Sequence, residues 1–185
     1  MSDAKCILCR EALLKVGQKS DYGATIIFKI GDSEKNGWFA TLSPRTGGNP
    51  EKDFSIQIMP IAHLINFSQI NESAELAKNY GLAFAKISAA ASKVIEKELK
   101  KESPRIISLG TYGKCKHENE HIHIKLFPYR GDIGQPFTVD SSYQKKEVYK
   151  DAEGAEFVKM KPIRKIEIHQ KRFNELVKLF ISSLR

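Results

Sequence analysis

The sequence predicts a single domain that combines β-strands with α-helices, and three patterns support this. Apolar and polar residues alternate with a period of two at 54–60 and again at 121–126, which is typical of strands. Between them, apolar residues recur at helical spacing over 76–95. A chain of 185 residues with 41% hydrophobic and 28% charged residues is long enough to bury a core and has the composition of a globular protein. We therefore expect one globular domain with embellishments.

The charge balance indicates which partners the chain attracts. Thirty Lys and Arg residues against 22 Asp and Glu residues give a formal net charge of +8, so the protein attracts polyanions such as nucleotides, nucleic acids and anionic surfaces. No apolar run approaches the length of a membrane span, and the first five residues lack an apolar signal region. The three cysteines, an odd number, do not predict a disulfide scaffold. We expect a cytoplasmic protein with reduced thiols and no membrane partner.

The N-terminal region predicts a short helix followed by a β-hairpin. Residues 11–16 have the pattern of a short helix. Residues 25–30 are rich in β-branched side chains and predict a strand, and residues 38–42 predict its partner. Turn-forming residues fill 31–37 between them, which favours a hairpin.

A loop and a third strand follow the hairpin. Residues 43–53 contain two prolines and two glycines and predict a loop. Arg45 and these glycines could meet a phosphate there, although a surface loop is the simpler interpretation. The alternating strand at 54–60 delivers His63 to a position just beyond its end. A single histidine in such a place is more often a turn residue than a ligand.

The long central helix begins at a cap, Asn71 or Ser73, and stops before Pro104. Glu72 and Glu75 lie near its positive end, which is favourable. Its apolar stripe consists of Leu76, Tyr80, Ala83, Phe84, Ile87, Ala91, Val94 and Ile95. We interpret this stripe as core and the helix as scaffold.

A histidine-rich strand follows a further strand at 105–109 and a turn at 110–116. Because side chains alternate along a strand, His121, His123 and Lys125 project from one face and the aliphatic residues between them face a core. Two imidazoles and an ammonium on a rigid strand form a candidate site for a metal, a phosphate or both. The alternation predicts a half-buried strand, and the alternative interpretation is a polar outer face that carries histidines without a function.

The C-terminal region predicts a second hairpin and a terminal helix. Residues 147–149 and 157–160 can pair around a turn at 151–154, and 164–168 can add a strand. The helix has one apolar face, made of Phe173, Leu176, Val177, Phe180 and Leu184. We expect this face to pack on the same domain or at a dimer seam.

Cys6 and Cys9 have the spacing that lets two thiolates bind one soft cation from a tight turn. By itself the pair is half a site, and a redox pair or coincidence explains it equally well. Cys115 lies between Lys114 and Lys116, which indicates an exposed loop, so we expect it not to be a ligand.

Four motifs occur in an order that resembles the histidine triad superfamily of nucleotide hydrolases and nucleotidyl transferases, which includes the branch of galactose-1-phosphate uridylyltransferase. They are Cys6-x-x-Cys9, a strand ending in Pro60-x-x-His63, the long helix, and His121-x-His123-x-x-x-x-Pro128-x-Arg130. The resemblance covers residues 6–130. It implies an α+β fold, in which a bent antiparallel sheet carries the long helix, commonly paired as a homodimer. We expect 1–130 to form this nucleotide-binding domain and 131–185 to form a C-terminal extension of a β-hairpin and a helix.

The resemblance also implies that different motifs have different roles. In zinc-bearing members, the cysteine pair, the histidine of Pro-x-x-His and the first triad histidine hold a structural Zn²⁺. The corresponding residues here are Cys6, Cys9, His63 and His121. Such a closed set of four ligands leaves no position for water, which suits structural zinc. His117 instead of His121 is the alternative fourth ligand.

The middle triad histidine is the family's nucleophile, and here it is His123. An imidazole can attack an α-phosphate when one ring nitrogen is unprotonated and the other is held by a backbone carbonyl. The product would be a covalent nucleotidyl-histidine, later passed to water or to another acceptor.

The chain departs from the common family pattern at several positions. Lys125 stands where a third histidine is usual and the uridylyltransferase branch has glutamine, and we expect it to act as a positive charge near the phosphate. In the family an acidic residue often binds the ribose, and this chain has Thr41 or Ser43 at the corresponding place. The substrate-binding candidates are Ser108, Tyr112, His117 and Thr41.

The leading hypothesis is a zinc-containing nucleotide hydrolase or nucleotidyl transferase that acts at an α-phosphate through His123. The alternative is a non-catalytic module that binds nucleotides, or nucleic acid through the basic C-terminal third. The lysines and arginines of that third also have a simpler explanation as a solubilising surface. A third possibility is a purely structural protein, in which a metal ion stabilises the fold and the histidine strand is unreactive.

Overall fold

The computed structural model describes residues 5–47, 49–98, 109–114, 121–129, 143–162 and 166–185. Its elements are α1 (Ile7–Ala12), β1 (Thr25–Ile30), β2 (Trp38–Leu42), β3 (Arg45–Thr46), β4 (Ile56–Pro60), the 3₁₀-helix η1 (Phe67–Glu72), α2 (Ala74–Glu98), β5 (Leu109–Lys114), β6 (His123–Pro128), β7 (Tyr143–Lys150), β8 (Glu156–Pro162), β9 (Ile166–Glu167) and α3 (Gln170–Ser183).

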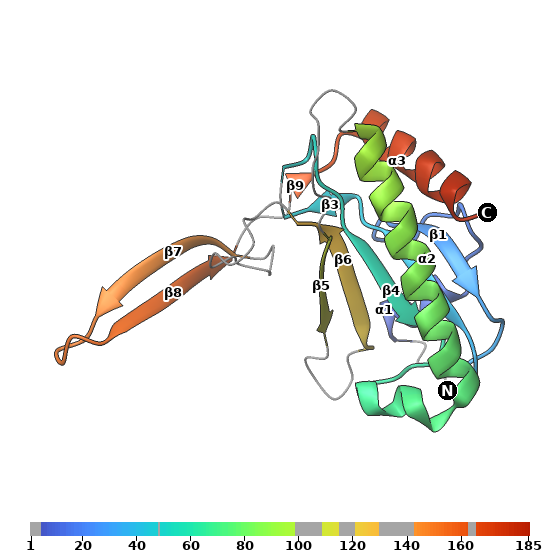
Figure 1. The fold of residues 1–185 in the computed structure, drawn as a ribbon, viewed down its shortest axis with the longest axis horizontal. Helices are drawn as coiled ribbons and strands as arrows, with labels where there is room; N and C mark the ends of the chain where they lie inside the picture. The colour runs from blue at the N-terminus through green and yellow to red at the C-terminus, as the bar shows by residue number, and fades with distance from the viewer. Residues whose placement is uncertain (1–4, 48, 99–108, 115–120, 130–142, 163–165) are drawn as a thin grey trace.

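The centre of the fold is a five-stranded antiparallel sheet with the strand order β1-β2-β4-β6-β5. The predicted hairpin is present as β1 and β2, and the predicted strand at 54–60 is present as β4. Helices pack against this sheet (Figure 1), so the protein has an α+β fold. The histidine-bearing strand β6 lies between β4 and β5, which places its residues inside the sheet.

The long helix α2 covers one face of the sheet, as its apolar stripe predicts. Ser73 caps it, because its hydroxyl accepts a hydrogen bond from the Leu76 amide at 3.3 Å. The indole N–H of Trp38 on β2 donates to the Leu76 carbonyl at 2.9 Å and so fixes the first turn of the helix on the sheet. The buried stripe meets the aliphatic side chains of β6 in one large core.

The C-terminal helix α3 packs beside α2 on the same core. Its residues Phe173, Leu176 and Phe180 are buried, and the Phe180 ring meets Phe54 edge to face at 5.1 Å. Immediately before this helix, β9 pairs with β3. The apolar face of α3 therefore packs within the chain, whereas the predicted division at residue 130 falls on residues outside the described ranges.

The opposite face of the sheet is covered differently. Near α1 it carries a small apolar cluster, in which Ala12 packs on Ile26, Phe39 and Met59. Farther along the strands, toward β3, the same face becomes polar. This polar part of the sheet carries the residues described below.

The second hairpin, β7 and β8, forms around the predicted turn and is longer than expected. Gly154 occupies this turn with a φ of 84°, a conformation that glycine adopts without strain. Figure 1 shows the hairpin extending away from the sheet and helices. Among the described residues, no helix is both long enough and apolar enough to cross a membrane.

Four local predictions were wrong. The first helix spans Ile7–Ala12 instead of 11–16, so it starts next to Cys6. Most of the predicted turn at 110–116 is the strand β5, whose lack of alternating apolar residues hid it. The predicted loop at 43–53 contains the short strand β3. Strand β6 is buried on both sides instead of half-buried, because His123 and Lys125 are themselves buried.

Candidate metal centre and adjoining site

Three separate segments bring two cysteines and two histidines together. Cys6 occupies the N-cap position of α1, and Cys9 lies in the first turn of that helix on the same side. His63 follows the end of β4, and His121 precedes β6. The Ile122 amide donates to the Leu64 carbonyl at 2.8 Å, which ties the two histidine segments to each other.

The distances among these side chains fit a single ion. Cys9 Sγ lies 3.2 Å from His63 Nδ1 and 3.5 Å from His121 Nδ1. Cys6 Sγ lies 3.7 Å from His121 Nδ1, and all four ligand atoms are within 4.8 Å of one another. A tetrahedral ion with metal–sulfur bonds of about 2.3 Å and metal–nitrogen bonds of about 2.05 Å requires sulfur–nitrogen edges of about 3.6 Å. The four side chains can therefore bind a metal ion.

The orientation and charge of His121 suit a metal ligand. Its Nε2–H donates to the Pro60 carbonyl at 2.9 Å, so the neutral ring presents the lone pair of Nδ1 to both sulfurs. Burial, aided by the nearby rings of His63 and His123, lowers the pKa of His121 to about 4, although the bond to Pro60 opposes this shift. The imidazole is therefore neutral at pH 7, and only a neutral imidazole binds a metal.

His123 lies two residues farther along the same face of the strand and is 5% exposed. Its Nδ1 lies 3.3 Å from the His121 carbonyl oxygen, so this nitrogen carries the proton and donates it. In the neutral ring, the lone pair is then on Nε2. The backbone of one candidate ligand thus orients the neighbouring imidazole.

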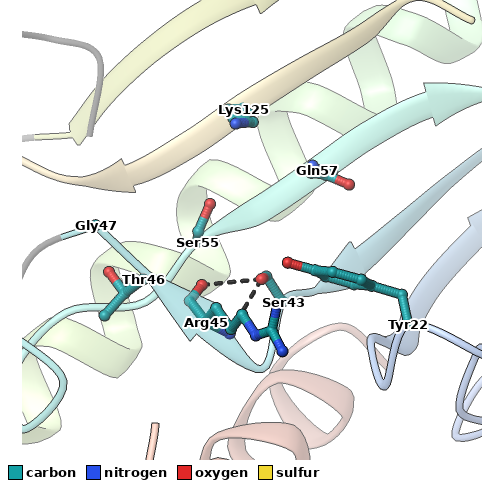
Figure 2. Close-up of a pocket in the computed structure, with 8 residues that line it drawn as sticks. All are labelled: Tyr22, Ser43, Arg45, Thr46, Gly47, Ser55, Gln57 and Lys125. Carbon is teal, nitrogen blue, oxygen red and sulfur yellow. Dashed lines mark hydrogen bonds between the residues drawn. The ribbon is translucent and has the colours of Figure 1, made fainter. Parts of the chain in front are cut away.

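Lys125 continues this face of β6 and lines a cavity of about 100 Å³ on the polar part of the sheet. Figure 2 shows Lys125 on β6, Gln57 on β4 and Tyr22 on the segment before β1 around this cavity. The other residues that line it are Ser43, Arg45, Thr46, Gly47 and Ser55. The Ser43 hydroxyl donates to the Arg45 carbonyl at 2.8 Å and accepts from the Arg45 amide at 3.1 Å, which shapes the turn into β3.

The structure places the other predicted site residues only in part. Thr41 is fully buried on β2 and is not among the residues lining this cavity, whereas its alternative Ser43 is. Ser108, His117 and Cys115 lie outside the described residues, and for Tyr112 only the backbone, in β5, is described. The predicted roles of these four residues remain predictions.

Four residues that line the cavity were not predicted from the sequence, namely Tyr22, Thr46, Ser55 and Gln57. Gln57 had a detectable signal, because it is the polar member of the alternating strand β4. Its partner was not readable from the sequence, since only the register shows that it lies opposite Lys125. Tyr22, Thr46 and Ser55 carried no signal of this kind.

The arrangement thus combines a closed set of four ligands with an oriented imidazole and a cation-lined cavity on one face of the sheet. Comparisons of the chain with protein-family models, with curated proteins and with solved structures give no match. The chemistry of the site therefore has to be inferred from its own residues.

Proposed function

We propose that this protein is a nucleotide hydrolase or nucleotidyl transferase of the histidine triad type, which attacks an α-phosphate with His123. The observation that carries the proposal is the contact of 3.3 Å between His123 Nδ1 and the His121 carbonyl. It fixes the tautomer in which the lone pair is on Nε2, beside four side chains that could hold a metal ion.

The reaction follows from this tautomer. Nε2 of His123 donates its electron pair to the α-phosphorus, the bond from phosphorus to the leaving group breaks, and the leaving group keeps that electron pair. In the second step a water molecule attacks the phosphorus and loses a proton to solvent, and the ring leaves as neutral imidazole. In a transferase, another acceptor takes the place of water. Because negative charge is spread over the phosphate oxygens, nearby cations stabilise the transition state, and Lys125 supplies one.

Zinc is the ion that best suits the candidate metal centre. Two thiolates and two imidazoles form the closed tetrahedral set typical of structural Zn²⁺. The ion would join α1, the end of β4 and the start of β6, and so hold His123 in position. A redox role for the cysteine pair is less well supported, because both thiols contact histidine nitrogens.

Steady-state turnover of nucleoside phosphates by His123→Ala tests the proposal. We expect the variant to lose at least a thousandfold in kcat, because no other described residue presents an oriented nucleophile there, while its metal content and circular dichroism stay unchanged. His169→Ala is the matched control, since His169 is an exposed histidine at the N-cap of α3. Release of mononucleotide by His123→Ala at the parent's rate would refute the covalent mechanism.

A second candidate function is binding of nucleic acid or another polyanion without turnover. The β7–β8 hairpin favours this function, because its backbone register pairs Lys145 with Lys161. Basic residues that neighbour one another attract a phosphate backbone. A gel-shift assay with single- and double-stranded oligonucleotides across a salt series tests it. Binding that weakens steeply with salt supports this function, and no shift at low salt excludes it. Homodimer formation also remains a prediction, which light scattering can test.

A further inference from the structure

The polar part of the sheet is organised in rows across neighbouring strands. Thr41 on β2 lies opposite Gln57 on β4, which lies opposite Lys125 on β6. One step farther along, the Ser43 amide donates to the Ser55 carbonyl at 2.9 Å, so these two serines are neighbours as well. In an apolar core such rows would bury unsatisfied polar groups at a considerable free-energy cost. Their presence on this face favours a polar ligand.

The cavity above these rows is too small to enclose a whole nucleotide. Its volume is about 100 Å³, whereas pockets for drug-sized ligands span roughly 300–1,000 Å³. It is therefore a subsite for one small part of a ligand. Hydroxyl and amide side chains provide hydrogen bonds around it.

The two charged residues that line the cavity are both cations. Arg45 and Lys125 line it, and none of its described lining residues is acidic. Glu167 holds Arg45 from outside the cavity, with its Oε1 2.9 Å from Nη2 and 3.3 Å from Nε. The guanidinium also lies 5.5 Å from the centre of the Tyr22 ring. These contacts position the guanidinium at the edge of the cavity.

We infer that this cavity is a subsite for a phosphate-bearing leaving group, the part of the substrate that departs when His123 attacks. The inference rests on the proposed function. Lys125 lies two residues beyond His123 on the same strand face, a separation of about 6.6 Å along the strand. Consecutive phosphates of one polyphosphate chain can therefore contact both positions. Arginine and lysine are the side chains that proteins use to bind phosphate.

The leaving-group chemistry is consistent with Lys125 at the third triad position. When the bond between the α-phosphorus and the bridging oxygen breaks, a terminal phosphate or polyphosphate takes the electron pair and departs as an anion, so it needs no proton. An amine leaving group needs a proton as it departs, and a histidine can provide one. A cation that stabilises the departing oxygens is sufficient for a phosphate leaving group. The favoured substrates are therefore those that carry further phosphates beyond the attacked one.

Two measurements test the inference with the chain of 185 residues. The first is the ratio of kcat/KM for a dinucleoside tetraphosphate to that for a nucleoside phosphoramidate. We expect Arg45→Gln to reduce this ratio at least tenfold, because Arg45 acts on the leaving phosphate. Lys78→Gln is the control, because it removes one exposed charge from α2, away from the cavity, and it should keep the parent's ratio. An equal loss with the two substrates in Arg45→Gln would overturn the inference.

The second measurement is calorimetric binding of inorganic tripolyphosphate, which requires no turnover. We expect Arg45→Gln to bind at least tenfold more weakly than the parent, and the control Lys78→Gln to bind as tightly as the parent. No binding to the parent, or an equal loss in both variants, would overturn the inference. If the parent binds tripolyphosphate through Arg45 and turns over neither nucleotide substrate, the proposed function fails and the anion subsite stands as a site for free polyphosphate.

Discussion

The polar face that runs from His121 into β6 meets two different environments. Just before the strand, His121 is 1% exposed, and its ring nitrogens contact the two sulfurs and the Pro60 carbonyl. Two residues beyond His123, Lys125 borders a cavity lined with hydroxyls and a guanidinium. The region around His121 is closed around its own ligand atoms, and the region around Lys125 has room for part of a ligand.

This difference separates a structural role from a binding role within one strand. A closed set of ligands stabilises the chain mainly when its ion is bound, because the free energy of metal binding then adds to that of folding. A polar cavity has no such requirement and can exchange its contents with solvent. His123 lies between the two, so the metal centre can hold it rigid while the cavity receives part of the substrate. The predictions below test this separation.

The largest effect on stability is expected from loss of the metal centre. Cys9→Ser should reduce bound zinc from one ion per chain to less than one tenth, as measured by plasma mass spectrometry. It should also lower the free energy of unfolding by several kcal/mol, part of the roughly 10–16 kcal/mol that structural zinc contributes in small zinc-finger peptides.

Cys115→Ser provides the control for this variant, because the sequence predicts that Cys115 is not a ligand. It should keep one ion per chain and the parent's stability. Full zinc content in Cys9→Ser would show that the cluster does not hold the ion.

The next largest effect on stability is expected from a change in the apolar core under α3, which contains none of the candidate metal ligands. Phe180 is fully buried on α3 and meets Phe54 edge to face. Phe180→Ala should lower the free energy of unfolding by about 3–5 kcal/mol in urea titrations, because it removes an aromatic side chain and leaves a cavity. The zinc content should remain at one ion per chain. A parallel loss of zinc at temperatures where the variant is folded would contradict the separation of scaffold and metal centre.

A smaller effect is expected from the titration of His121 in the metal-free protein. The pKa of His121 is lowered to about 4 in the folded state, whereas an unfolded histidine has an ordinary pKa of 6.5. The unfolded state therefore binds the proton first, and stability falls as pH decreases from 6.5 towards 4. The free energy of unfolding should decrease by about 2–3 kcal/mol between pH 7 and pH 4.5.

Urea titrations at several pH values, after removal of metal with a chelator, measure this dependence. His121→Gln provides the comparison, because it cannot titrate and should lack this component. The same slope in His121→Gln as in the parent would assign the pH dependence to other groups.

The sequence was sufficient to predict those helices and strands in which the spacing of apolar residues follows directly from which side of the element is buried. The stripe from Leu76 to Ile95 has helical spacing because one side of α2 is buried, and the alternation in β4 and β6 follows from the pleat of the sheet. The four residues of the candidate metal centre were also predictable as a set, from the order and spacing of their motifs in the sequence. Strand β5 was not, since its glycines and polar residues lack an alternating apolar pattern.

Contacts between distant segments determine the remaining features. The pairing of β3 with β9 joins two strands of two residues each across more than a hundred positions, and no local pattern reveals it. The same pairing brings Glu167 to Arg45 and so fixes one cation of the cavity. The register between β4 and β6, which places Gln57 beside Lys125, depends on the whole sheet. A predicted surface loop at Arg45 thus becomes part of a site only through the tertiary structure.

The central claim is that His123 forms a covalent bond to phosphorus, and one measurement tests it most directly. The protein is mixed with a nucleoside phosphoramidate or a dinucleoside tetraphosphate, quenched within milliseconds and analysed by mass spectrometry of its peptides. The account predicts a nucleotidyl group attached at His123, which is lost in His123→Ala and retained in the control His169→Ala. Turnover with no nucleotidyl group on any histidine, or with the group on a residue other than His123, would contradict the account.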